Sequence, residues 1–126
     1  MKELILKIEE TTFDDMCGFI ITTTKQTIKL GISDYQVCCE NYGYFMSEDN
    51  LNEFINSELI KIEIADTLLK ENTEFDVNSM YEGDVMFVNI HTNNGLLQFV
   101  AYNEHNGYYG HTAIIKSEEL NYETIL

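Results

Sequence analysis

Cysteine and histidine, the residues best suited to nucleophilic chemistry, gather in two parts of this sequence. Cys38 and Cys39 are adjacent, and His105 and His111 bracket the stretch NGYYG. With an acid such as Glu104, they could form a constellation in which histidine activates a thiol. Neighbouring residues on a strand point to opposite faces, so at most one of the two cysteines can serve such a site. Geometry defines a catalytic constellation of this kind, and spacing along a chain does not supply it.

The charges nearest to the two cysteines oppose thiol reactivity. A reactive cysteine needs a nearby positive group to stabilise its thiolate, whereas the local sequence supplies Asp34 and Glu40. Cysteine is also among the residue types most often buried. We therefore interpret both cysteines as structural, assign no catalytic residue and predict a protein that is not an enzyme.

The same side chains, together with Cys17, could in principle ligate zinc. Their spacing matches no closed tetrahedral pattern, and the sequence has no CxxC or HxxxH motif. We predict no metal and no cofactor. His91 alternates with Phe87 and Asn89, which indicates a position on the surface of a sheet.

The stretch YNEHNGYYGH (102–111) combines tyrosines with turn-forming residues. Asn106–Gly107 is a strong turn signal, because glycine adopts positive φ at no steric cost and asparagine tolerates it. One interpretation is a hairpin turn whose tyrosines pack on the sheet; the other is a contact surface, since tyrosine is favoured in both stacking and protein recognition. The candidate partner- or ligand-binding residues are Tyr102, His105, Asn106, Tyr108 and Tyr109, with Tyr42 and Tyr44 from the similar stretch ENYGYF.

Acidity is the strongest property of the chain as a whole. Twenty-two acidic residues against seven Lys and Arg give a formal net charge of −15. Phosphate binding draws on clusters of Lys and Arg, so direct nucleic-acid binding is not expected. An acidic surface either keeps a protein soluble or meets a basic partner.

Length, cysteine content and hydropathy predict a single domain (1–126) in the cytoplasm of a host. The three cysteines show no disulfide framework, which favours a reducing compartment. No apolar run is long enough for a transmembrane helix, and the start MKELILKIEE lacks the cleavage site of a signal peptide. The oligomeric state is left open.

Period-two alternation predicts a mostly β (α+β) fold, a single antiparallel twisted sheet of about six or seven strands with one short helix packed on it. Strands are expected near residues 4–9, 18–32 as a hairpin turning near Lys25–Gln26, 59–66, 84–102 as a hairpin with a type I′ turn at Asn94–Gly95, and 111–116. A surface loop is expected over 68–82. The inward positions would be Leu4, Leu6, Ile8, Ile28, Leu30, Ile32, Ile60, Ile62 and Ile64.

SEDNLNEFINS (47–57) is the predicted helix. Ser47 would be its N-cap, and Leu51, Phe54 and Ile55 would form one apolar stripe facing the sheet.

Two motifs, Cys38-Cys39-Glu40 and Asn106-Gly107-Tyr108-Tyr109, carry a family resemblance. Together with Thr92 and Gly95 at a fixed spacing, they resemble an uncharacterised family of small proteins carried by phages and prophages. The chain departs from that family's pattern at Val37 and at Val100–Ala101, where the family has Asp and an Arg-Trp pair, and at the residues flanking Asn-Gly-Tyr-Tyr. The resemblance implies a viral or prophage accessory protein and supplies no activity.

These features favour a non-enzymatic binding protein that acts on a host protein with a basic surface, for example an inhibitor of a defence nuclease or a nucleic-acid mimic. Three alternatives stay open: a sponge for a nucleotide signal, with tyrosines stacking on a base; an enzyme using a Cys/His site; and a virion structural component. Nucleotide that copurifies with the protein would favour the sponge. Activity that survives alkylation of the thiols would exclude the Cys/His enzyme. Mass spectrometry of purified particles would detect a virion component.

Overall fold

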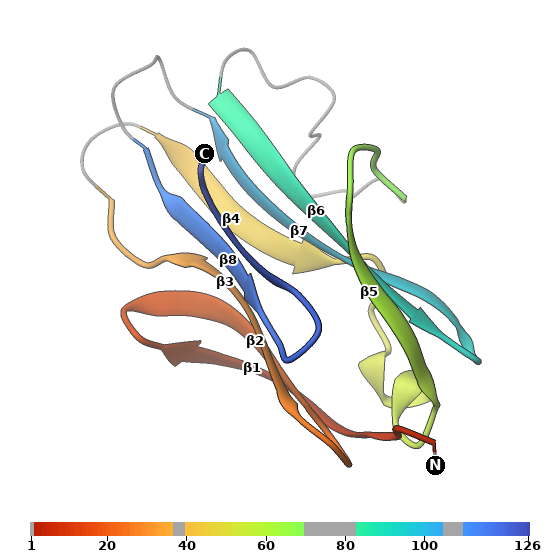
Figure 1. Ribbon diagram of the computed structural model, residues 1–126. Coiled ribbons are helices and arrows are strands. Elements are labelled where there is room, and N and C mark those ends of the chain that lie inside the picture. Colours follow the sequence, from red (N-terminus) through yellow and green to blue (C-terminus); the bar gives the residue numbers. More distant parts are fainter. Residues whose placement is uncertain (1, 37–39, 70–82, 105–109) are drawn as a thin grey trace.

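Nine strands form two antiparallel sheets in the computed structural model, which describes residues 2–36, 40–69, 83–104 and 110–126 (Figure 1). The first sheet runs, in spatial order, β1 (Ile5–Phe13), β2 (Met16–Thr23), β3 (Thr27–Ser33), β8 (Thr112–Lys116) and β9 (Asn121–Ile125). The second runs β4 (Asn41–Met46), β7 (Gly95–Glu104), β6 (Gly83–Thr92) and β5 (Leu59–Ala65).

The prediction of a single sheet with a helix packed on it is wrong. The described part of the chain is all-β, and its one helical element is the 3-10 turn η1 (Leu51–Phe54). Alternation shows that one face of each strand is buried, but it does not show what covers that face. A four-residue turn cannot cover a sheet, so a second sheet takes that place, as in other β-sandwiches.

The hydrophobic core lies between the two sheets. Ile21, Leu30 and Ile115 from the first sheet are fully buried against Val88 and Phe99 from the second. Burial of each such side chain stabilises the fold by roughly 1.5–3 kcal/mol. Tyr44 joins the same layer, with its ring edge-on to Phe19 at 5.7 Å.

The segment predicted as a helix over 47–57 is short because its polar residues prefer other conformations. Ser47 does not cap it: the Ser47 amide donates to the Gln98 carbonyl, and the Ser47 hydroxyl accepts from the Gln98 amide. Asn56 ends the segment with a positive φ of 68°, which asparagine tolerates better than most residues. The apolar stripe is nevertheless placed as predicted, since Phe54 is buried and Leu51 and Ile55 pack against the core.

Two strands contradict the predicted inward faces, because each carries a register shift near its start. Ile28, Leu30 and Ile32 are buried as predicted. In β1 the shift lies between Ile5 and Lys7, so that Ile5 is buried and Leu6 is 48% exposed. In β5 the shift lies between Leu59 and Lys61, and Ile60 is 61% exposed. An extra residue in one strand of a pair changes the face of the sheet to which the preceding side chains point.

Two of the hairpin turns contain residues with positive φ, and they differ in which residue types adopt it. The hairpin β6–β7 forms as predicted, but its two-residue turn is Asn93–Asn94, and Gly95 takes a φ of 120° while Asn94 lacks the positive φ of a type I′ turn. Asp14 and Asp15, between β1 and β2, have φ of 50° and 63°, as a type I′ turn requires.

The hairpin over 18–32 turns where predicted, without glycine. The hydroxyl of Thr23 accepts hydrogen bonds from the amides of Lys25 and Gln26. These side-chain hydrogen bonds hold the turn without a glycine. The strand predicted over 111–116 corresponds to β8. Most of the predicted loop, residues 70–82, lies outside the described residues, and within those described no helix is long and apolar enough to span a membrane.

Candidate functional site

Three strand ends meet around one buried histidine. Ser33 ends β3, Glu40 directly precedes β4, and His111 directly precedes β8. The backbone of His111 extends the β8–β9 ladder, because its amide donates to the Leu126 carbonyl at 3.2 Å and its carbonyl accepts from the Leu126 amide at 2.8 Å. The imidazole is thereby held at a fixed position between strands from both sheets.

Both nitrogens of the His111 ring have oxygen partners. Nε2 lies 2.8 Å from Oε2 of Glu40, and both side chains are fully buried. Nδ1 lies 3.0 Å from the Ser33 hydroxyl and 3.1 Å from the Ser33 backbone carbonyl. The hydroxyl of Ser33 also accepts the amide of Thr112 at 3.2 Å.

These partners suit a ring that carries a proton on Nε2. A carboxylate oxygen accepts, so Nε2 donates to Glu40, whereas Nδ1 can either donate to the Ser33 carbonyl or accept from the Ser33 hydroxyl. The hydrogen bond from Nε2 stabilises the buried carboxylate of Glu40, whose desolvation is costly. We therefore describe His111 and Glu40 as a buried hydrogen-bonded pair.

Two tyrosine rings enclose the imidazole. Tyr42 stacks on it with centroids 4.0 Å apart and Tyr35 lies nearly parallel on it at 5.0 Å. Stacked rings of this kind stabilise the fold beyond the area that they bury. Burial, then the nearby charge of Asp34, raises the pKa of Tyr42, so its phenol stays neutral. Tyr35 is 51% exposed and forms the solvent side of the stack.

The Ser–His–Glu contacts have the chemistry of a hydrolase triad but not its access. A nucleophilic serine must reach a substrate, and Ser33 is 6% exposed with its hydroxyl engaged by Thr112 and His111. In this arrangement the cluster ties β3, β4 and β8 together. The sequence groups His111 with Glu104 and the two cysteines, and it does not indicate Ser33 or the direct contact of Glu40 with the histidine. No spacing signal links Glu40 to a histidine 71 residues away.

The structure separates the other predicted contact residues. Tyr42 and Tyr44 lie on the inner face of the second sheet, whereas Tyr102 lies on its outer face beside Phe45, with its hydroxyl over Gly43. Burial, then a 2.7 Å hydrogen bond to Glu10, raises the pKa of Tyr44 far above its usual range. Cys38, Cys39, His105, Asn106, Tyr108 and Tyr109 lie outside the described residues.

Of the other described thiol and imidazole groups, His91 lies apart from this cluster, whereas Cys17 lies near enough to Tyr42 to raise the pKa of its phenol. The ring of His91 contacts the carboxylate of Glu63 on the outer face of the second sheet, and this contact, with Lys61, lowers the pKa of Glu63. Burial raises the pKa of the Cys17 thiol to about 11. Among the described residues, no three His, Cys, Asp or Glu side chains gather as a metal site would require.

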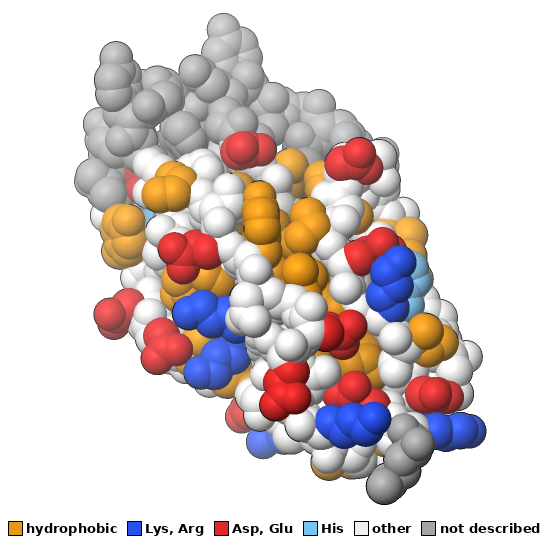
Figure 2. Space-filling model, viewed as in Figure 1, with side chains coloured by type: hydrophobic (Ala, Val, Ile, Leu, Met, Phe, Trp, Pro, Cys, Tyr) orange, Lys and Arg blue, Asp and Glu red, His pale blue; other side chains and the backbone are white. Residues whose placement is uncertain are grey.

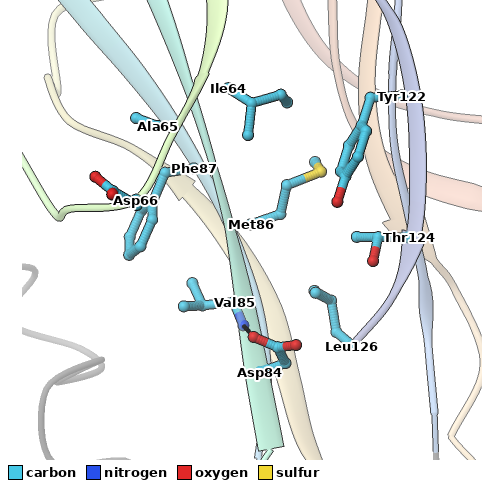
Figure 3. A pocket seen from close by; sticks show the side chains of 10 residues that line it. All are labelled: Ile64, Ala65, Asp66, Asp84, Val85, Met86, Phe87, Tyr122, Thr124 and Leu126. Carbon is cyan, nitrogen blue, oxygen red and sulfur yellow. Dashed lines mark hydrogen bonds between the residues drawn. The ribbon is translucent and has the colours of Figure 1, made fainter.

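A cavity of about 340 Å³ opens where β9 lies against β5 and β6 (Figure 3). We name it the edge groove; its lining residues are Ile64, Ala65, Asp66, Asp84, Val85, Met86, Phe87, Tyr122, Thr124 and Leu126. Sequence analysis missed this groove, because β9 carries little apolar alternation and was not predicted as a strand.

Residues 2–115 match the family described as a domain of unknown function (DUF7448). The chain belongs to this family. The match includes every residue of the buried histidine cluster, and three residues of the edge groove, Tyr122, Thr124 and Leu126, lie beyond the matched segment. The chain matches no curated protein and no solved structure.

The DUF7448 match also spans both motifs that suggested an uncharacterised family, Cys38-Cys39-Glu40 and Asn106-Gly107-Tyr108-Tyr109. Glu40 is the last residue of the first motif, and His111 follows the second by two positions. The Glu40–His111 contact therefore joins the last residue of the first motif to a residue two positions beyond the second.

Proposed function

We propose that this chain is a non-enzymatic accessory protein of a phage or prophage that binds a basic surface on a host protein in the host cytoplasm and inhibits that protein. The resemblance to phage-borne proteins supports the origin. The distribution of charge supports the mode of binding, and it is the observation on which the proposal depends.

The acidic side chains are on the surface. Within the described residues, Glu40 is the one buried acid, and the others are exposed or half-buried. Three lysines that could offset them lie close to carboxylates, in the pairs Lys7–Glu9 at 3.3 Å, Lys29–Asp14 at 3.4 Å and Lys61–Glu63 at 3.2 Å. A surface of this kind attracts a basic partner over several ångströms and speeds its association.

The alternatives receive less support from the described residues. A nucleotide sponge needs donors for phosphate, but the charged side chains that line the edge groove are those of Asp66 and Asp84. An enzyme using His111 needs an accessible nucleophile, and Ser33 is nearly covered.

The test is salt-dependent binding to basic host nucleases, measured with the immobilised chain at 25, 150 and 500 mM NaCl and followed by nuclease assays. Because salt screens exposed charges, binding at 25 mM should weaken at least tenfold by 500 mM. The matched control replaces five exposed acids (Glu9, Glu10, Glu118, Glu119 and Glu123) with glutamine, and it should bind weakly at every salt concentration. The proposal fails if no basic protein binds at 25 mM, or if salt and the five substitutions leave binding unchanged.

A further inference from the structure

The edge groove lies where the two sheets part. Strand β9 is the last strand of the first sheet and β5 the last strand of the second, and β6 lies beside β5. Strand alternation directs Ile64, Met86 and Tyr122 toward the space between the sheets. A cavity of about 340 Å³ reaches the lower end of the size range of small-ligand sites, roughly 300–1,000 Å³.

Apolar side chains form the floor of the edge groove, and apolar and polar side chains stand at its sides. Met86 and Leu126 are each 3% exposed and form the floor, whereas Ile64 and Tyr122 are 37% and 42% exposed and stand at the sides. Figure 3 shows the thioether of Met86 directed toward the Tyr122 ring, and the hydroxyls of Tyr122 and Thr124 on the same side. Such a surface suits an aliphatic chain with a polar end.

The charged side chains at the edge groove favour a ligand whose polar end is positively charged. Asp66 and Asp84 line it, and the lining contains no Lys, Arg or His. One carboxylate oxygen of Asp84 accepts the Val85 amide at 2.9 Å, which orients the group. A carboxylate has about four acceptor positions, so this bond leaves capacity for a ligand. On the face shown in Figure 2, hydrophobic side chains form a strip between β9 and β6, and acidic side chains border it.

We propose that the edge groove binds one lysine or arginine side chain of a basic protein partner. The aliphatic stem would lie against Met86 and the Tyr122 ring, with the cationic group at Asp84. The chemistry fits both residues, because their long stems are apolar and their ends are cations that a carboxylate attracts. This inference rests on the proposed function, and it assigns the place where such a partner is anchored.

The probe is the capped tripeptide acetyl-Gly-Arg-Gly-amide, titrated into the uniformly ¹⁵N-labelled chain at 25 mM NaCl. We expect amide shifts concentrated at Ile64, Val85 and Thr124, with millimolar affinity. The same peptide with citrulline, which keeps the shape of arginine without its charge, should bind at least fivefold more weakly.

Two variants with the same loss of charge separate the edge groove from the acidic surface as a whole. Asp84→Asn should weaken peptide binding at least threefold, whereas Glu123→Gln, on the opposite face of β9, should change it less than 1.5-fold. Tyr122→Ser should also weaken binding, and thermal unfolding curves will show that each variant is folded.

The outcomes distinguish this inference from the proposed function. Equal binding of the citrulline peptide, shifts spread evenly over the acidic surface, or equal effects of Asp84→Asn and Glu123→Gln would overturn the groove assignment, and salt-dependent binding of a basic nuclease would still stand. If the arginine peptide maps to the groove but no basic protein binds at 25 mM NaCl, the proposed function fails and the cation site stands.

Discussion

His111 illustrates how much one buried side chain can depend on its partners. Its two nitrogens face a carboxylate and a carbonyl, and its ring lies between Tyr35 and Tyr42. Removing the imidazole would take away the hydrogen bond that Nε2 donates to the buried carboxylate of Glu40. The cost of breaking such a pair generally exceeds the net stability that the intact pair contributes.

We therefore expect His111→Ala to lower the free energy of unfolding by about 3–5 kcal/mol, because a buried carboxylate loses a hydrogen-bond donor and the missing ring leaves a cavity. Urea denaturation followed by circular dichroism measures this change. His91→Ala is the matched control, because His91 contacts Glu63 at a position where both side chains are more than one-third exposed. The control should show no measurable change, and equal midpoints for the two variants would contradict a stabilising role for the buried pair.

Cys17 provides a second prediction at the scale of one residue. Burial raises the pKa of its thiol to about 11 from an ordinary value of 9.0, so the thiolate population at pH 8 should be about 100-fold smaller than in the unfolded chain. In a chain carrying Cys38→Ser and Cys39→Ser, iodoacetamide should label Cys17 slowly in buffer and rapidly in urea. Equal rates would show that the thiol is not protected.

The same shift has a consequence for stability at high pH. The unfolded thiol loses its proton near pH 9 and the folded thiol near pH 11. The contribution of the thiol to stability is therefore fully present below pH 9 and is lost as the pH rises to 11. Cys17→Ala should flatten this part of the curve of unfolding free energy against pH.

At the scale of elements, the turn between β1 and β2 holds an aspartate in a strained backbone conformation that a substitution can relieve. Asp15 has a φ of 63° in a two-residue turn where glycine is preferred. Asp15→Gly should stabilise the protein by about 0.5–1 kcal/mol, because the left-handed conformation costs other residues about 1–2 kcal/mol and glycine gives part of this back as entropy. Gly95→Ala, at a φ of 120°, should destabilise it. Thermal unfolding of both variants measures the effect, and a shift of the same sign in the two would contradict it.

The alternation of apolar and polar residues predicted where the strands lie better than it predicted which face of a strand is buried or which segments contact each other. The hairpin β6–β7 and the buried positions of β3 follow from patterns local to each segment. The register shifts that expose Leu6 and Ile60 depend on how β1 and β5 begin beside each other, at the bridge between Leu4 and Glu58. The Glu40–His111 pair depends on strands distant in the chain, and no local pattern encodes such contacts.

At the scale of the whole molecule, the net charge of −15 opposes compaction. Like charges on a folded surface are closer together than in an extended chain, so mutual repulsion destabilises the folded state. The Debye length falls from about 30 Å at 0.01 M salt to about 8 Å at 0.15 M, so moderate salt screens most of this repulsion. Three local lysine–carboxylate pairs do little to offset it, because exposed pairs contribute little.

We therefore expect the unfolding temperature to rise by several degrees between 10 and 150 mM NaCl and to change little from 150 to 300 mM. Choline chloride should give the same curve, because screening depends on ionic strength and not on ion type. The variant with five exposed acids replaced by glutamine carries a net charge of −10 (−15 plus five), so it should start at a higher unfolding temperature and respond less to salt. A temperature that is independent of salt, or that responds equally in both chains, would show that surface repulsion is not what limits stability. The acidic surface would then be available for partner binding without a measurable cost to the fold.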